Sequence, residues 1–227
     1  RTDDSRIDTW LQQLQARHLA DLRVPEVTRA LRALSSAYVE RRQKVVARGA
    51  TLDSAGKRAA FALYYAPLHF LTTRAILEAL HAQGGTLSTI VDVGCGTGAA
   101  GAAWALAAGA TPSVTGLDRH PWAVAEARWT YRQLGLAGSA RQGDALWLPP
   151  LRAGAGIVAA YAMNEFAADA RARFEERLLE AAGRGVRVLI IEPIARGITP
   201  WWDEIAARVR AAGGRADEWR SEEHTSE

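Results

Sequence analysis

Alternate glycines follow an acidic residue near the middle of the chain, where an apolar run ends. This glycine loop and the acid before it comprise Asp92, Gly94, Cys95, Gly96 and Gly98. The apolar run, residues 90–93, is typical of a parallel strand covered on both faces, and glycine lets the backbone turn sharply against a ligand. Residues 99–108 are predicted to form a helix, whose first N–H groups can hold polar parts of that ligand. The residue types and spacing therefore predict a nucleotide-type cofactor site.

The loop resembles motif I of class I S-adenosylmethionine-dependent methyltransferases, an apolar strand and an acid before Gly-x-Gly-x-Gly. The resemblance implies that Asp92 and the loop residues bind S-adenosylmethionine. An NAD(P)-type oxidoreductase is the rival interpretation, because Gly96, Gly98 and Gly101 fit Gly-x-Gly-x-x-Gly. Asp118 also lies 20 residues after Gly98, the spacing expected of the acid in a dinucleotide-binding unit. Asp92 favours the methyl donor, which carries an ammonium group, whereas a carboxylate gains nothing beside a pyrophosphate.

Two further acids follow the next predicted strands. The resemblance implies that Asp118 accepts hydrogen bonds from the ribose hydroxyls, which suits an acceptor-only carboxylate. Its alternative role is to cap the helix that begins at Pro121. Residues 143–145 resemble the motif whose acid contacts the adenine amino group, and a plain turn with Asp144 exposed is the alternative. The predicted cofactor-binding residues in these later segments are Arg119, Asp144, Ala145 and Tyr161.

The methyl acceptor is expected at the end of the fourth predicted strand. Amino-group methyltransferases carry an Asp or Asn, two prolines and an aromatic residue there; Asn164 and Phe166 resemble the ends of that motif, but the prolines are absent. We predict Asn164 and Glu165 as catalytic residues, with Glu165 acting either as a general base or as a helix cap. Glu192 follows the fifth strand and either lines the same face or belongs only to the strand end. The acceptor itself is not predicted.

Two regions position these residues. Residues 1–83 carry apolar side chains at helical spacing and predict an N-terminal helical region, whose third helix is expected to bend or break at Pro67. Strands and helices alternate in residues 84–219, which predicts an α/β methyltransferase domain with a Rossmann-like, mostly parallel sheet. The predicted strands cover residues 89–93, 113–117, 139–142, 156–161 and 186–191. The resemblance places a C-terminal hairpin after them, so we expect this domain to be truncated, with the hairpin missing or only begun at Arg215.

Composition limits the remaining function classes. One cysteine cannot form an internal disulfide, which makes the cytoplasm the expected location. No run of 18 apolar residues occurs, so we expect no membrane partner, and no metal site is assigned. Arginine greatly outnumbers lysine, 26 to 2, which indicates a GC-rich, bacterial genome more than a binding surface. Residues 220–227 resemble a translated sequencing adapter and are expected to be a non-native tail.

RNA is the partner that the N-terminal charge suggests. Residues 1–83 hold 13 basic and 8 acidic residues, a balance that suits either a phosphate footprint or a solvated helical face. The candidate contacts are Arg41, Arg42, Lys44, Arg48, Lys57 and Arg58. We also predict that Tyr65 and His69 fold over the cofactor from this region.

A narrower resemblance also points to RNA. It is carried by the segments 64–67 (Tyr-Tyr-Ala-Pro), 159–165 (Ala-Ala-Tyr-Ala-Met-Asn-Glu) and 191–193 (Ile-Glu-Pro), together with the glycine loop. Over roughly residues 55–195 these segments resemble the methyltransferase-like family associated with the mitochondrial small ribosomal subunit and its bacterial relatives, although no cysteine cluster follows Glu192. That resemblance implies ribosomal RNA or the small subunit as partner. A ribosome assembly factor that retains the cofactor fold without catalysis is the corresponding alternative function.

Overall fold

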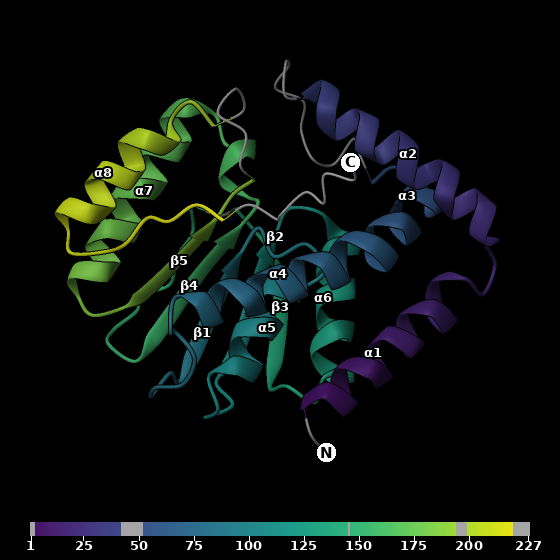
Figure 1. The fold of residues 1–227 in the computed structure, drawn as a ribbon, viewed down its shortest axis with the longest axis horizontal. Helices are drawn as coiled ribbons and strands as arrows, with labels where there is room; N and C mark the ends of the chain where they lie inside the picture. The colour runs from purple at the N-terminus through teal and green to yellow at the C-terminus, as the bar shows by residue number, and fades with distance from the viewer. Residues whose placement is uncertain (1–2, 42–51, 145, 194–198, 220–227) are drawn as a thin grey trace, which may run out of the picture.

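Five parallel strands form one sheet at the centre of the molecule (Figure 1). The computed structural model describes residues 3–41, 52–144, 146–193 and 199–219. The strands are β1 (Thr89–Val93), β2 (Ser113–Asp118), β3 (Gly138–Gln142), β4 (Ala155–Ala160) and β5 (Arg187–Ile191). Their order is β3-β2-β1-β4-β5. The chain adds β2 and β3 on one side of β1 and then returns to add β4 and β5 on the other side, so the switch point lies between β1 and β4. Open parallel sheets bind ligands at such a switch point, beyond the carboxyl ends of the strands.

The register brings the predicted site residues to this edge. Val93, the last residue of β1, pairs with Leu117 on β2 and with Ala159 on β4. The glycine loop, Asp118 and Tyr161 therefore all leave the sheet at its carboxyl edge. Each strand lies within two residues of its predicted bounds. The buried strands β1 and β4 are apolar runs that are clear in the sequence, whereas β3 is mostly exposed and carries little apolar pattern.

Helices cover both faces of the sheet, which confirms the predicted Rossmann-like α/β fold (Figure 1). Successive residues of a strand point to opposite faces. Ile90 accordingly packs in one core with helices α5 (Ala99–Ala107) and α6 (Pro121–Gln133). Val91 packs in the other core with α7 (Ala168–Gly183) and α8 (Trp202–Ala211).

The predicted N-terminal helices are present and share a core with the sheet. They are α1 (Asp3–His18), α2 (Val24–Arg41), α3 (Ala55–Ala60), the π-helix η2 (Phe61–Tyr65) and α4 (Ala66–Ala79). Helix α4 lies across α5 (Figure 1). Trp10 of α1 packs on Phe70 of α4, with ring centroids 5.3 Å apart, and both belong to the core that contains Trp104 of α5. Residues on both sides of the predicted boundary at 83 thus bury one another.

The sequence predicted a bend or a break at Pro67, and the helix is not broken there. Residues 55–79 run continuously through α3, η2 and α4, and Pro67 lies in the first turn of α4. The irregularity occurs upstream, where the Ala66 N–H donates to the Phe61 carbonyl with π-helical spacing. Pro67 has no N–H to donate to the carbonyl four residues earlier, and that carbonyl, of Leu63, lies inside the π-helical turn. π-Helical turns are rare and frequently occur at functional sites.

Several expectations concern chain segments beyond these elements. Residues 212–219 contain no strand, so the start of a hairpin expected near Arg215 is not observed there. Ala145 and the tail at 220–227 lie outside the described residues. Among the helices that the structure describes, none combines the length and the apolar character needed to cross a bilayer.

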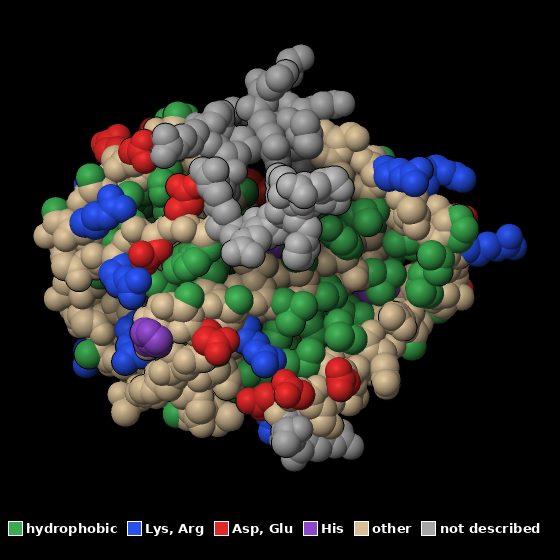
Figure 2. Space-filling model, in the orientation of Figure 1, with side chains coloured by type: hydrophobic (Ala, Val, Ile, Leu, Met, Phe, Trp, Pro, Cys, Tyr) green, Lys and Arg blue, Asp and Glu red, His purple; other side chains and the backbone are tan. Residues whose placement is uncertain are grey.

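An apolar groove lies on the N-terminal helical region, where α1, α2, η2 and α4 meet. It has a volume of about 410 Å³ and is lined by residues of α1, α2, η2 and α4. Large exposed apolar side chains gather at and beside it, as the green surface in Figure 2 shows. Val24 and Tyr64 line the groove, and Leu68 and Leu71 of α4 are further exposed apolar side chains.

Candidate cofactor and acceptor site

The glycine loop joins β1 to α5 in a conformation that requires its glycines. Gly94, Gly96 and Gly98 have φ angles of 63°, 52° and 81°, in the left-handed region that other residues rarely adopt. Gly98 is also the N-cap of α5. A Cβ atom on Gly98 would lie 2.8 Å from Cε1 of Tyr131, so the ring under the loop excludes any side chain. The alternate spacing recognised in the sequence therefore reflects both backbone conformation and close packing.

Two buried carboxylates accept hydrogen bonds from the backbone of the loop and of the first turn of α5. Asp92 Oδ2 accepts from the Gly101 N–H at 2.9 Å, and Asp118 Oδ2 accepts from the Gly96 N–H at 2.9 Å. Asp118 Oδ1 accepts from the His120 N–H at 2.8 Å. Each carboxylate oxygen can accept a second hydrogen bond, so these bonds leave acceptor capacity for a ligand.

The cap of α6 is not Asp118. His120 is its N-cap, and His120 Nδ1 accepts from the Trp122 N–H at 3.2 Å. The alternative role of Asp118 as helix cap is therefore wrong, because the chain needs two more residues to reach the first turn of α6. The interaction of Asp118 with the loop was not predicted.

Tyr131 of α6 forms the floor beneath the loop. Its ring is fully buried, and burial raises the pKa of its hydroxyl well above the usual 10.0, helped by the nearby Cys95 and Asp92. The hydroxyl has no hydrogen-bond partner in the described part of the chain. The phenol consequently stays protonated, and its ring packs against Gly98 of the loop.

We expect Tyr131→Phe to leave stability unchanged or to raise it by up to about 2 kcal/mol, because it removes a buried hydroxyl whose hydrogen bond is unmade. Urea unfolding measures the change. Tyr65→Phe is the matched control: Tyr65 Oη lies 3.1 Å from Ser35 Oγ, so this loss should cost about 1 kcal/mol. A destabilised Tyr131→Phe variant would show that its hydroxyl has a partner.

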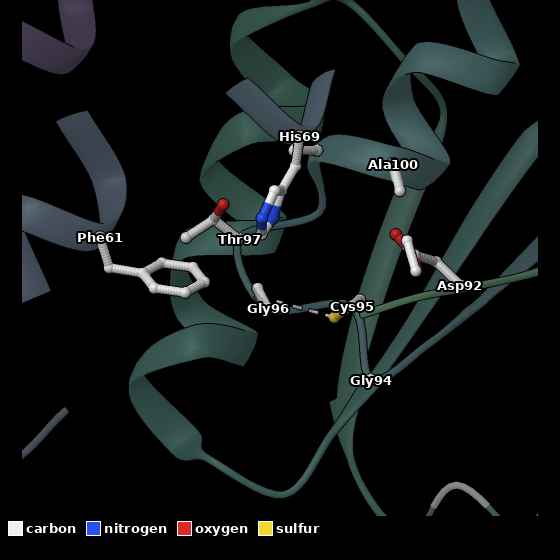
Figure 3. A pocket seen from close by; sticks show the side chains of 10 residues that line it. Phe61, His69, Asp92, Gly94, Cys95, Gly96, Thr97 and Ala100 are labelled. Atoms are coloured by element: carbon white, nitrogen blue, oxygen red, sulfur yellow. Dashed lines mark hydrogen bonds between the residues drawn. The ribbon is translucent and has the colours of Figure 1, made fainter. Parts of the chain in front are cut away.

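The N-terminal region closes over the glycine loop (Figure 3). Phe61 of η2 and His69 of α4 both line the cavity with the loop residues, and both rings point toward Gly96 and Thr97. His69 stacks on Tyr161 with ring centroids 4.1 Å apart and planes at 21°. The predicted place of His69 over the site agrees with this geometry. Tyr65 does not line this cavity but packs on His69, with ring centroids 5.8 Å apart.

The enclosed space is small in this arrangement. The cavity holds about 10 Å³, room for about one water, whereas pockets for cofactor-sized ligands usually span about 300–1,000 Å³. This cavity is therefore smaller than a ligand of that size. The lining combines glycine backbone and the carboxylate of Asp92 with apolar side chains such as Phe61 and Ala100. Phe61 was missed in the sequence, where only the unusual aromatic run at 61–65 marks it.

Tyr161, predicted to bind the cofactor, directly follows β4 at the carboxyl edge of the sheet. Its φ angle is 56°, a strained value for a residue with a side chain, and its N–H donates to the Ile191 carbonyl at 2.7 Å. Burial raises the pKa of the Tyr161 hydroxyl and the charge of Glu192 adds to this, while a hydrogen bond with Thr72 opposes it. The hydroxyl is thus neutral at physiological pH and is held at the junction of the sheet with α4.

Asn164 and Glu192 meet at the ends of β4 and β5. Both belong to the short segments that follow these strands, Asn164 in the 3₁₀ turn η3 (Met163–Glu165). Asn164 Nδ2 donates to Glu192 Oε2 at 2.6 Å, and the Met163 N–H donates to Glu192 Oε1 at 2.8 Å. Glu165 is exposed, and α7 begins after Ala167 without a side-chain cap. Its alternative role as cap of α7 is therefore wrong.

Asp144 and Arg119 form an exposed pair at the ends of β3 and β2. Arg119 Nη2 donates to Asp144 Oδ2 at 2.7 Å, and the Leu146 N–H donates to Asp144 Oδ1 at 2.9 Å. The backbone hydrogen bond from Leu146 lowers the pKa of Asp144, and Arg119 lowers it further. This turn with an exposed acid matches the plain-turn alternative, and contact with an adenine stays a prediction.

Cys95 is buried in the glycine loop, and its Sγ lies 3.6 Å from the Gly96 carbonyl oxygen (Figure 3). Its small side chain packs within the loop, and its predicted contact with the cofactor stays a prediction.

Comparison with known families places the loop within a recognised domain. Residues 90–183 match the family model described as a methyltransferase domain. This segment runs from β1 to α7 and contains Asp92, the glycine loop, Asp118 and Asn164. The match agrees with the fold predicted from the sequence and supports S-adenosylmethionine as the cofactor. No curated protein sequence matches the chain significantly.

Several solved structures are similar to the chain. One, from work on the conversion of a disulfide bond into a thioacetal group during echinomycin biosynthesis, is 25% identical with a TM-score of 0.41; the match covers 66% of this chain and 59% of that one. A SAM-dependent methyltransferase from Aquifex aeolicus is 20% identical with a TM-score of 0.48, covering 66% and 84%. The mitomycin 7-O-methyltransferase MmcR is 18% identical with a TM-score of 0.48, covering 96% and 68%. Because these TM-scores lie below 0.5, the likenesses say nothing about this protein's substrate.

Proposed function

We propose that the protein is an S-adenosylmethionine-dependent methyltransferase that binds the donor at the glycine loop and the acceptor beside β4 and β5. The observation that carries this proposal is the left-handed glycine loop at the switch point of the sheet, with Asp118 holding the Gly96 N–H. The methyltransferase-domain match to residues 90–183 supports it independently.

The chain's residues divide the work of binding and alignment. When bound, S-adenosylmethionine supplies an electrophilic methyl group on a sulfonium sulfur. Asp92 favours the donor's ammonium, Asp118 accepts from its ribose hydroxyls, and the loop glycines let the backbone approach. Methyl transfer needs the acceptor's lone pair in line with the methyl group, so positioning supplies most of the catalysis. Glu165, exposed near the same edge, takes a proton if the acceptor must lose one.

Calorimetric titration with S-adenosylhomocysteine tests the donor site. Saturable binding is expected, and Asp118→Ala should weaken it by about 100-fold, because the loss frees the Gly96 N–H and removes charge-assisted hydrogen bonds. Asp169→Ala, on the exposed part of α7, is the control and should bind normally. Absence of binding by the wild type, unchanged binding by Asp118→Ala, or preferential binding of NADH would each refute the proposal.

For the acceptor, we extend the proposal to ribosomal RNA or the small ribosomal subunit in the cytoplasm. This part rests on the narrower sequence resemblance and on the basic N-terminal region. Only Lys57 and Arg58 among the six predicted contacts have described side chains. Lys57 pairs with Asp53 at 2.9 Å, and Arg58 Nε donates to the Leu52 carbonyl. Transfer of a labelled methyl group to purified 30S subunits tests the enzyme; subunit binding that survives loss of donor binding would favour an assembly factor.

A further inference from the structure

Helices α1 and α2 diverge from the short connection, residues 19–23, that joins them (Figure 1). Two helices with so short a connection usually form an antiparallel hairpin and cover each other's apolar sides. Here α1 packs on η2 and α6, whereas α2 packs on α3 and η2. The apolar sides that the two helices turn toward each other therefore become walls of the groove of about 410 Å³.

The groove wall is mainly apolar, and its described residues carry no charge. Val24 and Tyr64 belong to this wall and are 62% and 50% exposed, although both are large. The polar groups of the described wall are uncharged and come from Gln15, Thr28 and Tyr64. Exposed apolar patches of this kind mark binding sites. A charged ligand would lose hydration here without gaining a partner, so the wall complements an uncharged, mainly apolar molecule.

The dimensions of the groove suit a small molecule. Its volume of about 410 Å³ lies in the range of about 300–1,000 Å³ that is usual for small-molecule sites. Twelve described residues form its wall, whereas a stable protein interface uses about 20–30 residues on each side. Thr28 Oγ1 donates to the Val24 carbonyl at 2.9 Å, which leaves the hydroxyl oxygen able to accept a hydrogen bond from a ligand.

The groove is separate from the donor cavity, although both lie beside η2. Leu63 and Tyr64 line the groove, whereas Phe61 lines the donor cavity. Helical residues two positions apart do not face the same side, so one short segment serves both walls. The described linings of the two spaces have no residue in common.

We propose that this groove is a second ligand site, which binds a small, uncharged, mainly apolar molecule between α1 and α2. The apolar wall supplies most of the affinity, and Gln15 and Thr28 offer hydrogen bonds to one polar group of the ligand. The site lies outside the donor and acceptor sites of the proposed function, and its occupancy does not depend on methyl transfer.

Fluorescence titration with N-phenyl-1-naphthylamine, an uncharged apolar probe, tests the site. Saturable binding is expected, and S-adenosylhomocysteine should not displace the probe. Two competitors then test the charge preference: methyl 1-naphthoate is uncharged, and 1-naphthoate carries a carboxylate on the same ring system. The ester should displace the probe at a concentration at least about tenfold lower, because the wall offers no partner to a buried charge.

Variants at Thr28 locate the probe. Thr28 is exposed, so Thr28→Asp brings a carboxylate into the wall without disturbing the buried core. This variant should weaken probe binding by at least about tenfold, whereas Thr28→Val keeps the shape and should retain binding. Ser36→Asp makes the same change from hydroxyl to carboxylate at an exposed position of α2 outside the described wall, and it should bind like the wild type. Circular dichroism checks that each variant keeps its helices.

The results decide this proposal independently of the donor site. Lack of saturable probe binding by the wild type overturns it. Displacement of the probe by S-adenosylhomocysteine, equal competition by the two naphthoates, or unchanged binding by folded Thr28→Asp does so as well. If the protein binds no S-adenosylhomocysteine, the donor site is refuted, and the naphthoates and the Thr28 variants still decide the groove.

Discussion

Replacing Gly98 by alanine is expected to destabilise the protein by about 3 kcal/mol and to weaken S-adenosylhomocysteine binding by at least about 100-fold. The new Cβ must adopt a φ of 81° and would lie 2.8 Å from the Tyr131 ring. Tyr131 cannot retreat easily, because it is fully buried between α6 and the sheet. Either the ring or the loop must shift, and both movements disturb the donor site. Urea unfolding and calorimetry measure the two effects.

Gly109→Ala separates strain from collision. Gly109 has a similar φ of 70°, but a Cβ there meets nothing within 4 Å. This control should cost about 1 kcal/mol for the left-handed conformation alone and should leave ligand binding unchanged. Equal losses in the two variants would mean that Tyr131 does not constrain the loop.

The second large effect is expected for Glu126→Ala, with a loss of about 3 kcal/mol in unfolding free energy. Glu126 of α6 is buried and receives three hydrogen bonds from α1: Arg17 Nε and Nη2 lie 2.9 and 2.6 Å from Oε1, and His18 Nε2 lies 3.0 Å from Oε2. The loss lies at the low end for a buried pair because the Arg17 side chain is 42% exposed. Removing the carboxylate leaves the three ring and guanidinium nitrogens of His18 and Arg17 without their acceptor, so α1 should loosen first. Urea unfolding and amide hydrogen exchange in α1 measure this.

Asp4→Ala is the control for Glu126→Ala, since it also removes an ion pair between α1 and another helix. The Asp4 pair with Arg74 spans 3.3 Å and is exposed on both sides. Exposed pairs contribute little, so this loss should stay below about 0.5 kcal/mol. Similar losses in both variants would contradict the role assigned to burial.

The Glu126 effect should depend on pH. Burial raises the pKa of Glu126, but hydrogen bonds and charges from His18 and Arg17 outweigh it, so the folded-state pKa lies below 4.5. A lowered carboxyl pKa stabilises the fold above the unfolded value, and this contribution disappears as pH falls through the folded value. The difference between wild type and Glu126→Ala should therefore be full at pH 7 and shrink below pH 4.5. A difference that grows in acid would contradict this assignment.

Much of the sheet and the donor loop could be predicted from the sequence because both depend on local patterns. Apolar runs mark strands such as β1 and β4, since each is covered on both faces. The glycines at 94, 96 and 98 mark a backbone conformation that few other residues allow. The break predicted at Pro67 did not occur, because the π-helical turn directly before Pro67 keeps the helix continuous. That turn could not be recognised from local sequence spacing.

The contacts that complete the site join residues far apart in the chain, and only the tertiary structure could decide them. Phe61 and His69 reach the glycine loop because α4 packs across α5, an arrangement of whole helices that no local spacing encodes. Asn164 and Glu192 are 28 positions apart and meet because β4 and β5 are neighbours. The sequence alone therefore determined the strand pattern and the conformation of the donor loop, through local backbone preference and burial. The packing of distant elements decided which side chains close over that loop and brought Asn164 into contact with Glu192.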